Sequence, residues 1–274
     1  GLVGSEMCIR DSPQFYYTDK NEMLKDYRVI LDEMEKKLPE IFGILPKAPY
    51  DLKEIEEYRA ASAPQAYYYS APEDRSRPGY FYVNTYDLPS RPKYTMTALA
   101  LHEAVPGHHL QIAIAQELDE MPFFRRNSGI TAYVEGWGLY AESLGYETGM
   151  YEDLYQQYGA LTFEMWRACR LVVDAGMHYK KWTRQQAVDF MREYTPNSEL
   201  DIQSEIDRYI AWPGQALAYK VGELKIKQLR AKAEKALGEK FDIRGFHDAV
   251  LENGAIPLPL LEQKIQEWIK ANMK

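Results

Sequence analysis

The spacing of apolar side chains from residue 94 to the end of the chain is the feature that most restricts its fold. Apolar residues recur there every three or four positions, which is the period of a helix with one buried face. Short segments rich in proline, glycine and asparagine interrupt the pattern and divide it into separate helices. The sequence predicts helices over 94–105, 107–119, 129–147, 151–178, 183–193, 198–211, 213–237 and 257–271.

The first third of the chain has a different pattern. Residues 19–38 have helical spacing, and Pro39 and Gly43 are expected to end that helix. Residues 65–69 (QAYYY) and 79–86 (GYFYVNTY) are rich in tyrosine, and a polar turn separates them, which predicts two paired strands. We therefore predict a mainly α fold with a small antiparallel strand pair before the densest polar cluster.

Composition excludes several classes of protein. The chain has 41 acidic and 33 basic residues, a net charge of -8, and no run of five basic residues, which excludes a typical nucleic-acid partner. No apolar stretch reaches the roughly 18–20 residues of a transmembrane helix. The two cysteines, Cys8 and Cys169, are too few for a disulfide framework or a thiolate zinc site.

The first residues differ from those that follow. Residues 1–12 (GLVGSEMCIRDS) have no apolar period, and we interpret them as a non-native or artefactual segment. The folded part is then residues 13–274. We exclude the first segment from the fold, so this end of the chain predicts no localisation.

Three of the five histidines lie within the segment LALHEAVPGHHLQ, namely His102, His108 and His109. Histidine is the commonest metal ligand in proteins. Glu103 lies in an otherwise apolar helix, where burying its charge is costly unless a metal or another cation compensates. The segment therefore predicts a metal site. The alternative is that Pro106 and Gly107 simply end one helix and that the histidines cap the next.

The spacing differs from the common zinc motif H-E-x-x-H, because the position four residues after His102 is Pro106. On a straight helix, His108 would lie about 9 Å along the axis and about 120° around it, and His109 about 10.5 Å away. Zinc–nitrogen bonds are only about 2.0–2.1 Å long. Proline disrupts helical hydrogen bonding, so together with Gly107 it can break the helix and turn His108 toward His102.

A catalytic zinc site usually has a third protein ligand. The helix predicted over 129–147 carries Glu135 and Glu142, which lie seven residues apart and therefore on one face. Gly136 and Gly138 would let another segment approach that helix closely. Either glutamate could instead be a solvated surface acid.

Four motifs in a fixed order resemble a known family. They are HEAVPGHHLQ, YVEGWGLYAE, VVDAGMH with a tryptophan four residues later, and RYIAWPGQALAYKVGEL. Together they resemble the bacterial family labelled domain of unknown function 885 (DUF885), which is grouped with the gluzincin zinc peptidases. The resemblance implies a gluzincin-like helical domain that binds Zn²⁺. Family members are usually longer, so we expect residues 13–274 to be the C-terminal catalytic portion of a larger protein whose upstream part is missing.

The resemblance also implies roles for individual residues. By position, it implies that His102 and His108 bind zinc, that Glu135 is the third ligand, and that Glu103 is the general base. His109 and Glu142 remain alternative ligands. In this interpretation, zinc activates a water molecule that attacks a carbonyl group, and Glu103 accepts the proton of that water. The candidate donors to the oxyanion are His178, Tyr209 and Tyr219.

We therefore expect a zinc-dependent metallopeptidase that acts on a peptide or small amide substrate. The segment GYFYVNTYD could supply a strand edge for an extended peptide. Three arginines could bind the carboxylate of that peptide, namely Arg167, Arg170 and Arg208. The alternative for these arginines is ion pairing at the surface. Two other functions remain open: a peptidase-derived binding or scaffold domain without turnover, and another zinc amidohydrolase. A scaffold would have no reason to keep Glu103 buried.

Overall fold

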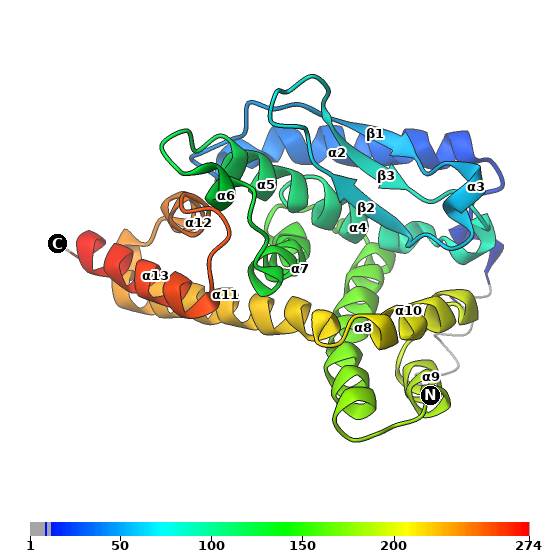
Figure 1. The fold of residues 1–274 in the computed structure, drawn as a ribbon. Helices are drawn as coiled ribbons and strands as arrows, with labels where there is room; N and C mark the ends of the chain where they lie inside the picture. The colour runs from blue at the N-terminus through cyan, green and yellow to red at the C-terminus, as the bar shows by residue number, and fades with distance from the viewer. Residues whose placement is uncertain (1–8, 10–11, 274) are drawn as a thin grey trace.

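A small sheet lies at one side of a mainly helical fold in the computed structural model, which describes residue 9 and residues 12–273 (Figure 1). Most of the segment over 1–12 that we interpret as non-native therefore lies outside the described residues. The predicted mainly α class is confirmed. Among the described residues, no helix is both long and apolar enough to cross a lipid bilayer.

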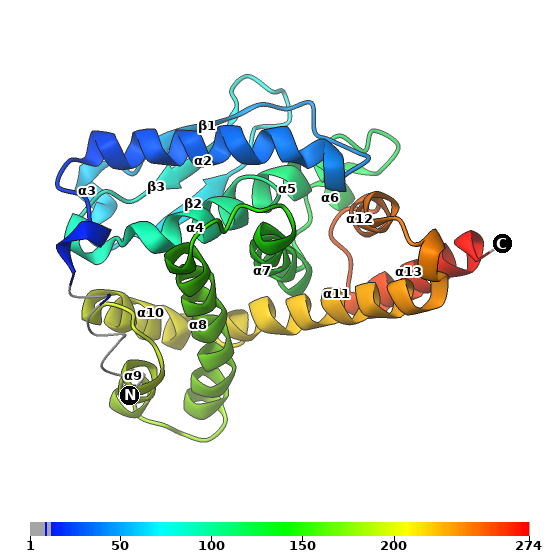
Figure 2. The same ribbon diagram turned by 180° about the vertical axis from the view of Figure 1, so that it is seen from behind.

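Helix α2 (Lys20–Ile41) lies across one face of the sheet, as Figure 2 shows from behind. The side chain of Asp19 caps its first turn by accepting a hydrogen bond from the amide of Asn21. The expectation that Pro39 ends this helix is wrong, because α2 continues to Ile41. Pro39 lies in the last turn, where its missing amide removes only one hydrogen bond. The buried face of α2 consists of Met23, Tyr27, Leu31, Met34 and Leu38.

The sheet has the strand order β1-β3-β2. Strands β2 (Ala66–Tyr69) and β3 (Gly79–Val83) are antiparallel, which confirms the predicted pair. Strand β1 (Tyr50–Glu54), which was not predicted from the sequence, runs parallel to β3 on its other side. Because β3 is paired on both sides, the expectation that its segment offers an edge to a peptide is wrong. A free edge belongs instead to β2.

The remaining helices agree closely with the predicted ranges. Two short helices, α3 (Glu57–Ala60) and α6 (Phe123–Arg126), and one regular helix, α12 (Ile243–Leu251), were not predicted. Capping boxes at Asp153 and Thr183 begin α8 and α9. The others are α4 (Met96–Glu103), α5 (His108–Gln116), α7 (Thr131–Glu147), α8 (Leu154–His178), α9 (Arg184–Tyr194), α10 (Glu199–Ala211), α11 (Gln215–Leu237) and α13 (Leu258–Asn272).

Helix α7 lies at the centre of the core, with α4 and α5 on one side and α11 on the other (Figures 1 and 2). Two glycines let the backbones of α7 and α11 touch: a Cβ added to Gly136 would lie 2.4 Å from the Cα of Gly222. The expected close approach at Gly136 is therefore confirmed. Trp137 is completely buried next to it. This packing fixes the position of α7, which carries both candidate glutamates.

Candidate metal centre

The helix that carries the first histidine is broken before the second. Helix α4 ends at Glu103 and α5 begins at His108, so the expected break is confirmed. The buried backbone in between is hydrogen-bonded, with the amide of His109 donating to Ala104 O and the indole of Trp137 donating to Pro106 O. A Cβ at Gly107 would lie 1.8 Å from the carbonyl oxygen of His102, so only glycine fits there.

The break brings His102, His108 and Glu135 together. The imidazole ring centroids of His102 and His108 lie 4.7 Å apart. One potential ligand atom from each of the three residues lies within 4.8 Å of the other two. The structure thus groups the three side chains that the sequence analysis selected as metal ligands.

The spacing of these atoms suits a tetrahedral zinc ion. Glu135 Oε2 lies 3.5 Å from His102 Nε2 and 3.4 Å from His108 Nε2. Two ligand atoms bonded to one tetrahedral zinc are about 3.4 Å apart, given bonds of about 2.0–2.1 Å. Glu135 Oε2 is also buried without a hydrogen-bond partner, which costs free energy unless something at the centre satisfies it. The donor set therefore fits Zn²⁺.

The electrostatics of the centre favour positive charge between these groups. Burial raises the pKa of Glu135, but the neighbouring imidazoles outweigh this effect and hold the pKa well below its usual range. Burial lowers the pKa of His102, but the carboxylates of Glu135 and Glu142 outweigh that effect and raise it to about 9. A cation is therefore stabilised at the point where the three side chains meet.

Glu142 supports His102 from the side opposite to Glu135. The ring Nδ1 of His102 donates to Glu142 Oε1 at 2.7 Å, and Arg167 pairs with the same oxygen at 3.2 Å. Such a contact fixes the ring orientation and directs Nε2 toward a metal. Gly138 leaves room for the ring, because a Cβ there would lie 2.7 Å from His102 Cε1. The structure therefore places Glu142 behind His102 and outside the group of three side chains.

His109, the other alternative ligand, lies outside the group of three. One residue further along α5 turns a side chain by about 100°, so His109 faces the sheet. Its Nδ1 is 2.8 Å from the hydroxyl of Tyr68, and its ring packs on Tyr50 with centroids 4.4 Å apart. Burial lowers the pKa of His109 to about 4, so the ring stays neutral.

A cavity of about 510 Å³ opens beside the three side chains. Its walls come from residues 61–68 together with α4, α7, α8, α10 and the first residues of α11. Glu103 lines this cavity and is 9% exposed.

The free edge of β2 faces away from β3. The amide of Asn84 donates to Gln65 O, so these two residues form a hydrogen-bonded pair. In an antiparallel pair such residues alternate, so the backbone groups of Ala66 and Tyr68 point away from β3, toward the free edge.

One of the three candidate donors lies at this cavity. Tyr219 lines it, and its ring is nearly parallel to that of His102 with centroids 6.0 Å apart. The hydroxyl of Tyr219 accepts a hydrogen bond from Gln215 Nε2 at 3.2 Å. It therefore lies close to the group of three residues.

The other two candidate donors have different partners and do not line the cavity. The hydroxyl of Tyr209 donates to Glu205 Oε2 at 2.8 Å and accepts from the indole of Trp166 at 3.0 Å. The ring of His178, at the end of α8, donates from Nε2 to the carbonyl oxygen of Tyr209 at 2.9 Å. Both bond to neighbouring groups of the fold, so their selection as oxyanion donors does not agree with the structure.

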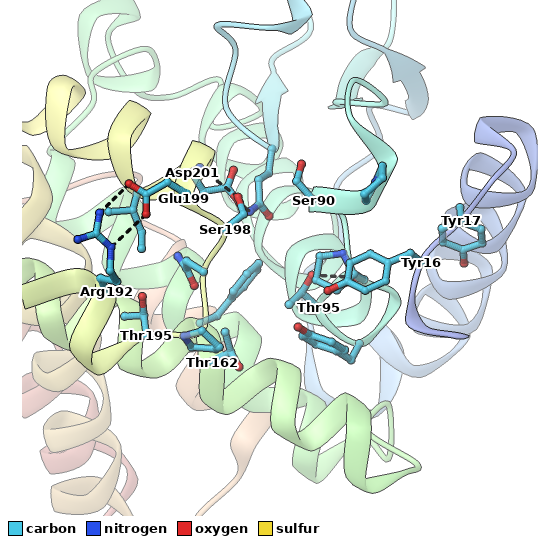
Figure 3. Close-up of a pocket in the computed structure, with 18 of the residues that line it drawn as sticks. Tyr16, Tyr17, Ser90, Thr95, Thr162, Arg192, Thr195, Ser198, Glu199 and Asp201 are labelled. Carbon is cyan, nitrogen blue, oxygen red and sulfur yellow. Dashed lines mark hydrogen bonds and ion pairs between the residues drawn. The ribbon is translucent and has the colours of Figure 1, made fainter. Parts of the chain in front are cut away.

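A second cavity of about 770 Å³ lies next to the first and is shown in Figure 3. It is lined mainly by tyrosines, prolines and hydroxyl side chains, with the ion pair of Arg192 and Glu199 at its edge. The two cavities share Gln65 and Asp201. Although larger, this cavity contains none of the three grouped side chains, so the smaller one is the candidate site.

Comparison with known proteins identifies the family. Residues 7–265 match the family described as "Bacterial protein of unknown function (DUF885)". The chain belongs to the DUF885 family. No match is found among curated proteins.

Two solved structures resemble this DUF885 chain. The crystal structure of a protein described as a "putative lipoprotein" from Colwellia psychrerythraea has a TM-score of 0.96 and 42% identity, covering 99% of this chain and 47% of that chain. A "putative lipoprotein of unknown function" from Shewanella oneidensis has a TM-score of 0.81 and 21% identity, covering 96% and 49%. The second likeness concerns the fold alone. The DUF885 chain spans about half the length of both proteins.

Two of the three candidate arginines of the DUF885 site are more deeply buried than the surface-pairing alternative implies, whereas Arg208 is partly exposed and paired with Glu205. Arg167 is 4% exposed and Arg170 is 1% exposed. Both lie on the face of α8 that also carries Phe163 and Trp166, at helical spacings of three, four and seven residues. That shared face was a signal in the sequence for their burial. The contacts that Gln215 makes with Glu135 and Tyr219 had no comparable signal in the sequence.

Proposed function

We propose that this chain carries a zinc-dependent metallopeptidase site, as the resemblance of its motifs to gluzincin peptidases implies. One observation carries the proposal: His102, His108 and Glu135 converge beside Glu103 in the wall of one cavity. Three protein ligands with an adjacent carboxylate are typical of a catalytic zinc site.

Each residue of the site has a defined task in this proposal. His102, His108 and Glu135 would hold Zn²⁺, which when bound lowers the pKa of a water molecule to about 7 and polarises a carbonyl group. The carboxylate of Glu103 accepts a proton from the attacking water and returns it to the leaving amine. The hydroxyl of Tyr219 donates a hydrogen bond to the oxygen on which negative charge develops.

The free edge of β2 supports a peptide as the substrate. Backbone groups of Ala66 and Tyr68 face away from β3, and both residues line the cavity. An extended peptide can pair with such an edge through main-chain hydrogen bonds, which are independent of its sequence. A scaffold domain without turnover gains nothing from Glu103 in the cavity wall, because burying a carboxylate costs free energy.

The first prediction concerns Glu103. The purified chain is expected to bind one zinc ion, as measured by elemental analysis after dialysis, and to cleave peptides in a mixed library read by mass spectrometry. Glu103→Gln should keep the zinc and lose about 10²- to 10⁴-fold in rate, because it removes the proton acceptor alone. Glu120→Gln, an exposed acid in the loop after α5, should behave like the wild type.

Adjacent histidines provide the matched control for the metal. His108→Gln should abolish stoichiometric zinc binding, whereas His109→Gln should retain it. Of these two neighbouring histidines, His108 faces Glu135 and His109 faces Tyr68. Stoichiometric zinc without hydrolysis of any peptide would favour the binding domain. Hydrolysis of simple esters or amides but no peptides would favour an amidohydrolase. A chain that binds no metal would exclude both hydrolase functions.

A further inference from the structure

Arg170 has no carboxylate partner although it is completely buried. Its side chain is 1% exposed and lines the cavity. Among the described residues, no carboxylate oxygen lies within 4.0 Å of its guanidinium group. The group packs over the rings of Tyr219, at 3.8 Å from the centroid, and Tyr209, at 4.8 Å. Buried arginines are normally paired with an anion, so this arrangement requires an explanation.

The other arginines in the same wall are each paired. Arg91 contacts Asp201 at 3.0 Å, and Arg167 contacts Glu142 at 3.2 Å. Arg208 is bound by both carboxylate oxygens of Glu205, at 2.9 and 2.7 Å. A comparable carboxylate is missing only at Arg170 in this set of four. Arg170 is therefore the one member of this set without a direct ion pair, because Glu205, which is already bound by Arg208, acts on it only from beyond ion-pair distance.

A neutral oxygen occupies the position where an anion would be expected. Gln215 Oε1 accepts from Arg170 Nη2 at 3.3 Å and from Arg208 Nη1 at 3.0 Å. The amide nitrogen of the same side chain faces Glu135 Oε1 at 3.4 Å. Two guanidinium groups thus meet at one side-chain oxygen, a single amide group away from the metal centre. A carboxylate oxygen would bind both groups more strongly than an amide oxygen does.

We propose that Arg170 and Arg208 form a carboxylate subsite, which binds the carboxylate of a short peptide after the side chain of Gln215 rotates aside. The inference rests on the proposed peptidase function and names its substrate class. One extended residue spans about 3.5 Å, so a carboxylate at this subsite lies within a residue or two of a carbonyl at the metal centre. The substrate is therefore a peptide with a carboxylate close to the bond that is cleaved.

The test measures binding and needs no turnover. Calorimetry with the metal-free chain compares N-acetyl-dialanine as the free acid with the same compound as the amide. We expect the acid to bind about tenfold tighter, because a charge-assisted hydrogen bond replaces a neutral one. Arg170→Met should reduce this preference to less than about twofold. Arg184→Met, which removes an exposed arginine of α9, should leave it unchanged.

A second variant keeps the test decisive if Arg170→Met does not fold. Gln215→Ala removes the neutral oxygen but keeps both guanidinium groups, so it should retain the preference for the acid or increase it. Equal binding of acid and amide by the wild type would overturn the subsite. An undiminished preference in folded Arg170→Met, or a lost preference in Gln215→Ala, would also overturn it.

Two further comparisons separate the possible outcomes. The first comparison uses N-acetyl-glutamyl-alanine amide, which carries only a side-chain carboxylate. If it binds as tightly as the dialanine acid, the subsite recognises acidic side chains. If it binds as weakly as the dialanine amide, the subsite recognises the carboxylate at a chain terminus. Failure of the proposed function appears separately, as a chain that prefers the acid but binds no zinc and cleaves no peptide. A chain that hydrolyses peptides without any preference for the acid would refute the subsite alone.

Discussion

Two glutamates of α7 hold the imidazole of His102 between them. Glu135 faces Nε2 at 3.5 Å from the cavity side, and Glu142 accepts from Nδ1 at 2.7 Å from the core side. The spacing of seven residues places both carboxylates on one face of the helix, as the sequence predicts. Their tasks differ because the ring lies between them: one carboxylate is free to bind a metal, and the other orients the ring.

Glu142→Gln is expected to lower zinc affinity by about tenfold or more, because supporting carboxylates typically contribute 10- to 100-fold. The variant keeps an oxygen that can accept from His102 Nδ1 but loses the charge that Arg167 pairs with. Competition with a fluorescent zinc chelator measures the affinity. Glu152→Gln, an exposed acid before α8, is the matched control. Unchanged affinity in Glu142→Gln would contradict the supporting role.

At the scale of helices, the candidate metal centre depends on the contact between α7 and α11. A Cβ at Gly222 would lie 1.8 Å from the carbonyl oxygen of Ala132 and 2.6 Å from the Cα of Gly136. Both obstructing atoms belong to the backbone and cannot rotate away. This contact fixes the distance between the two helices. It therefore also fixes the position of Glu135 on α7 relative to Gln215 on α11.

Gly222→Ala should destabilise the fold by about 1–3 kcal/mol, as overpacking does, despite the better helix propensity of alanine. Urea unfolding measures this loss, and zinc affinity should fall as well because α7 carries Glu135. Gly129→Ala provides the control, since a Cβ there has nothing within 4 Å. The close packing would be refuted if Gly222→Ala were as stable as the wild type.

The sequence predicted most helices because their apolar periods are long and proline or glycine separates them. It missed β1, whose five residues include three charged side chains and which pairs with a strand about thirty residues away. A nine-residue helix, α12, was also too short to stand out. The paired carboxylates of Glu135 and Glu142 followed from spacing. The partners of Tyr209 and His178 did not, because they depend on how α8 packs against α10.

At the scale of the whole molecule, His247 links three distant parts of the chain. It lies on α12; its Nδ1 donates to Ile41 O at the end of α2, and its Nε2 accepts from the hydroxyl of Tyr140 on α7. Its ring also stacks on Phe42. The residue is completely buried, so the folded state favours the neutral ring.

The stability of the fold should therefore fall in acid. Burial lowers the pKa of His247 from 6.5 to about 3, and nearby Arg230 acts in the same direction. Between these values the unfolded chain binds more protons than the folded one. The contribution is complete above pH 6.5 and decreases by up to about 1.4 kcal/mol per pH unit as the pH falls toward 3.

Urea unfolding of wild type and His247→Asn between pH 7.5 and pH 4.5 measures this contribution. The variant should be less stable at pH 7.5 and should lose less stability on acidification, because asparagine does not titrate. His109, whose pKa is also lowered, remains in both proteins and cancels in the comparison. Parallel curves for the two proteins would exclude His247 as a source of the acid sensitivity.

The buried break between α4 and α5 has a consequence for how relatives of this chain are found. Residues 104–107 are enclosed by the core, with Trp137 bonded to the carbonyl of Pro106 and no space for a side chain at Gly107. An inserted or deleted residue in such a segment would move His108 away from His102, so we expect relatives with the same site to keep this interval. A genome survey that searches for H-E-x-x-H passes over sequences of this kind, whereas one that searches for H-E-x-x-P-G-H retains them.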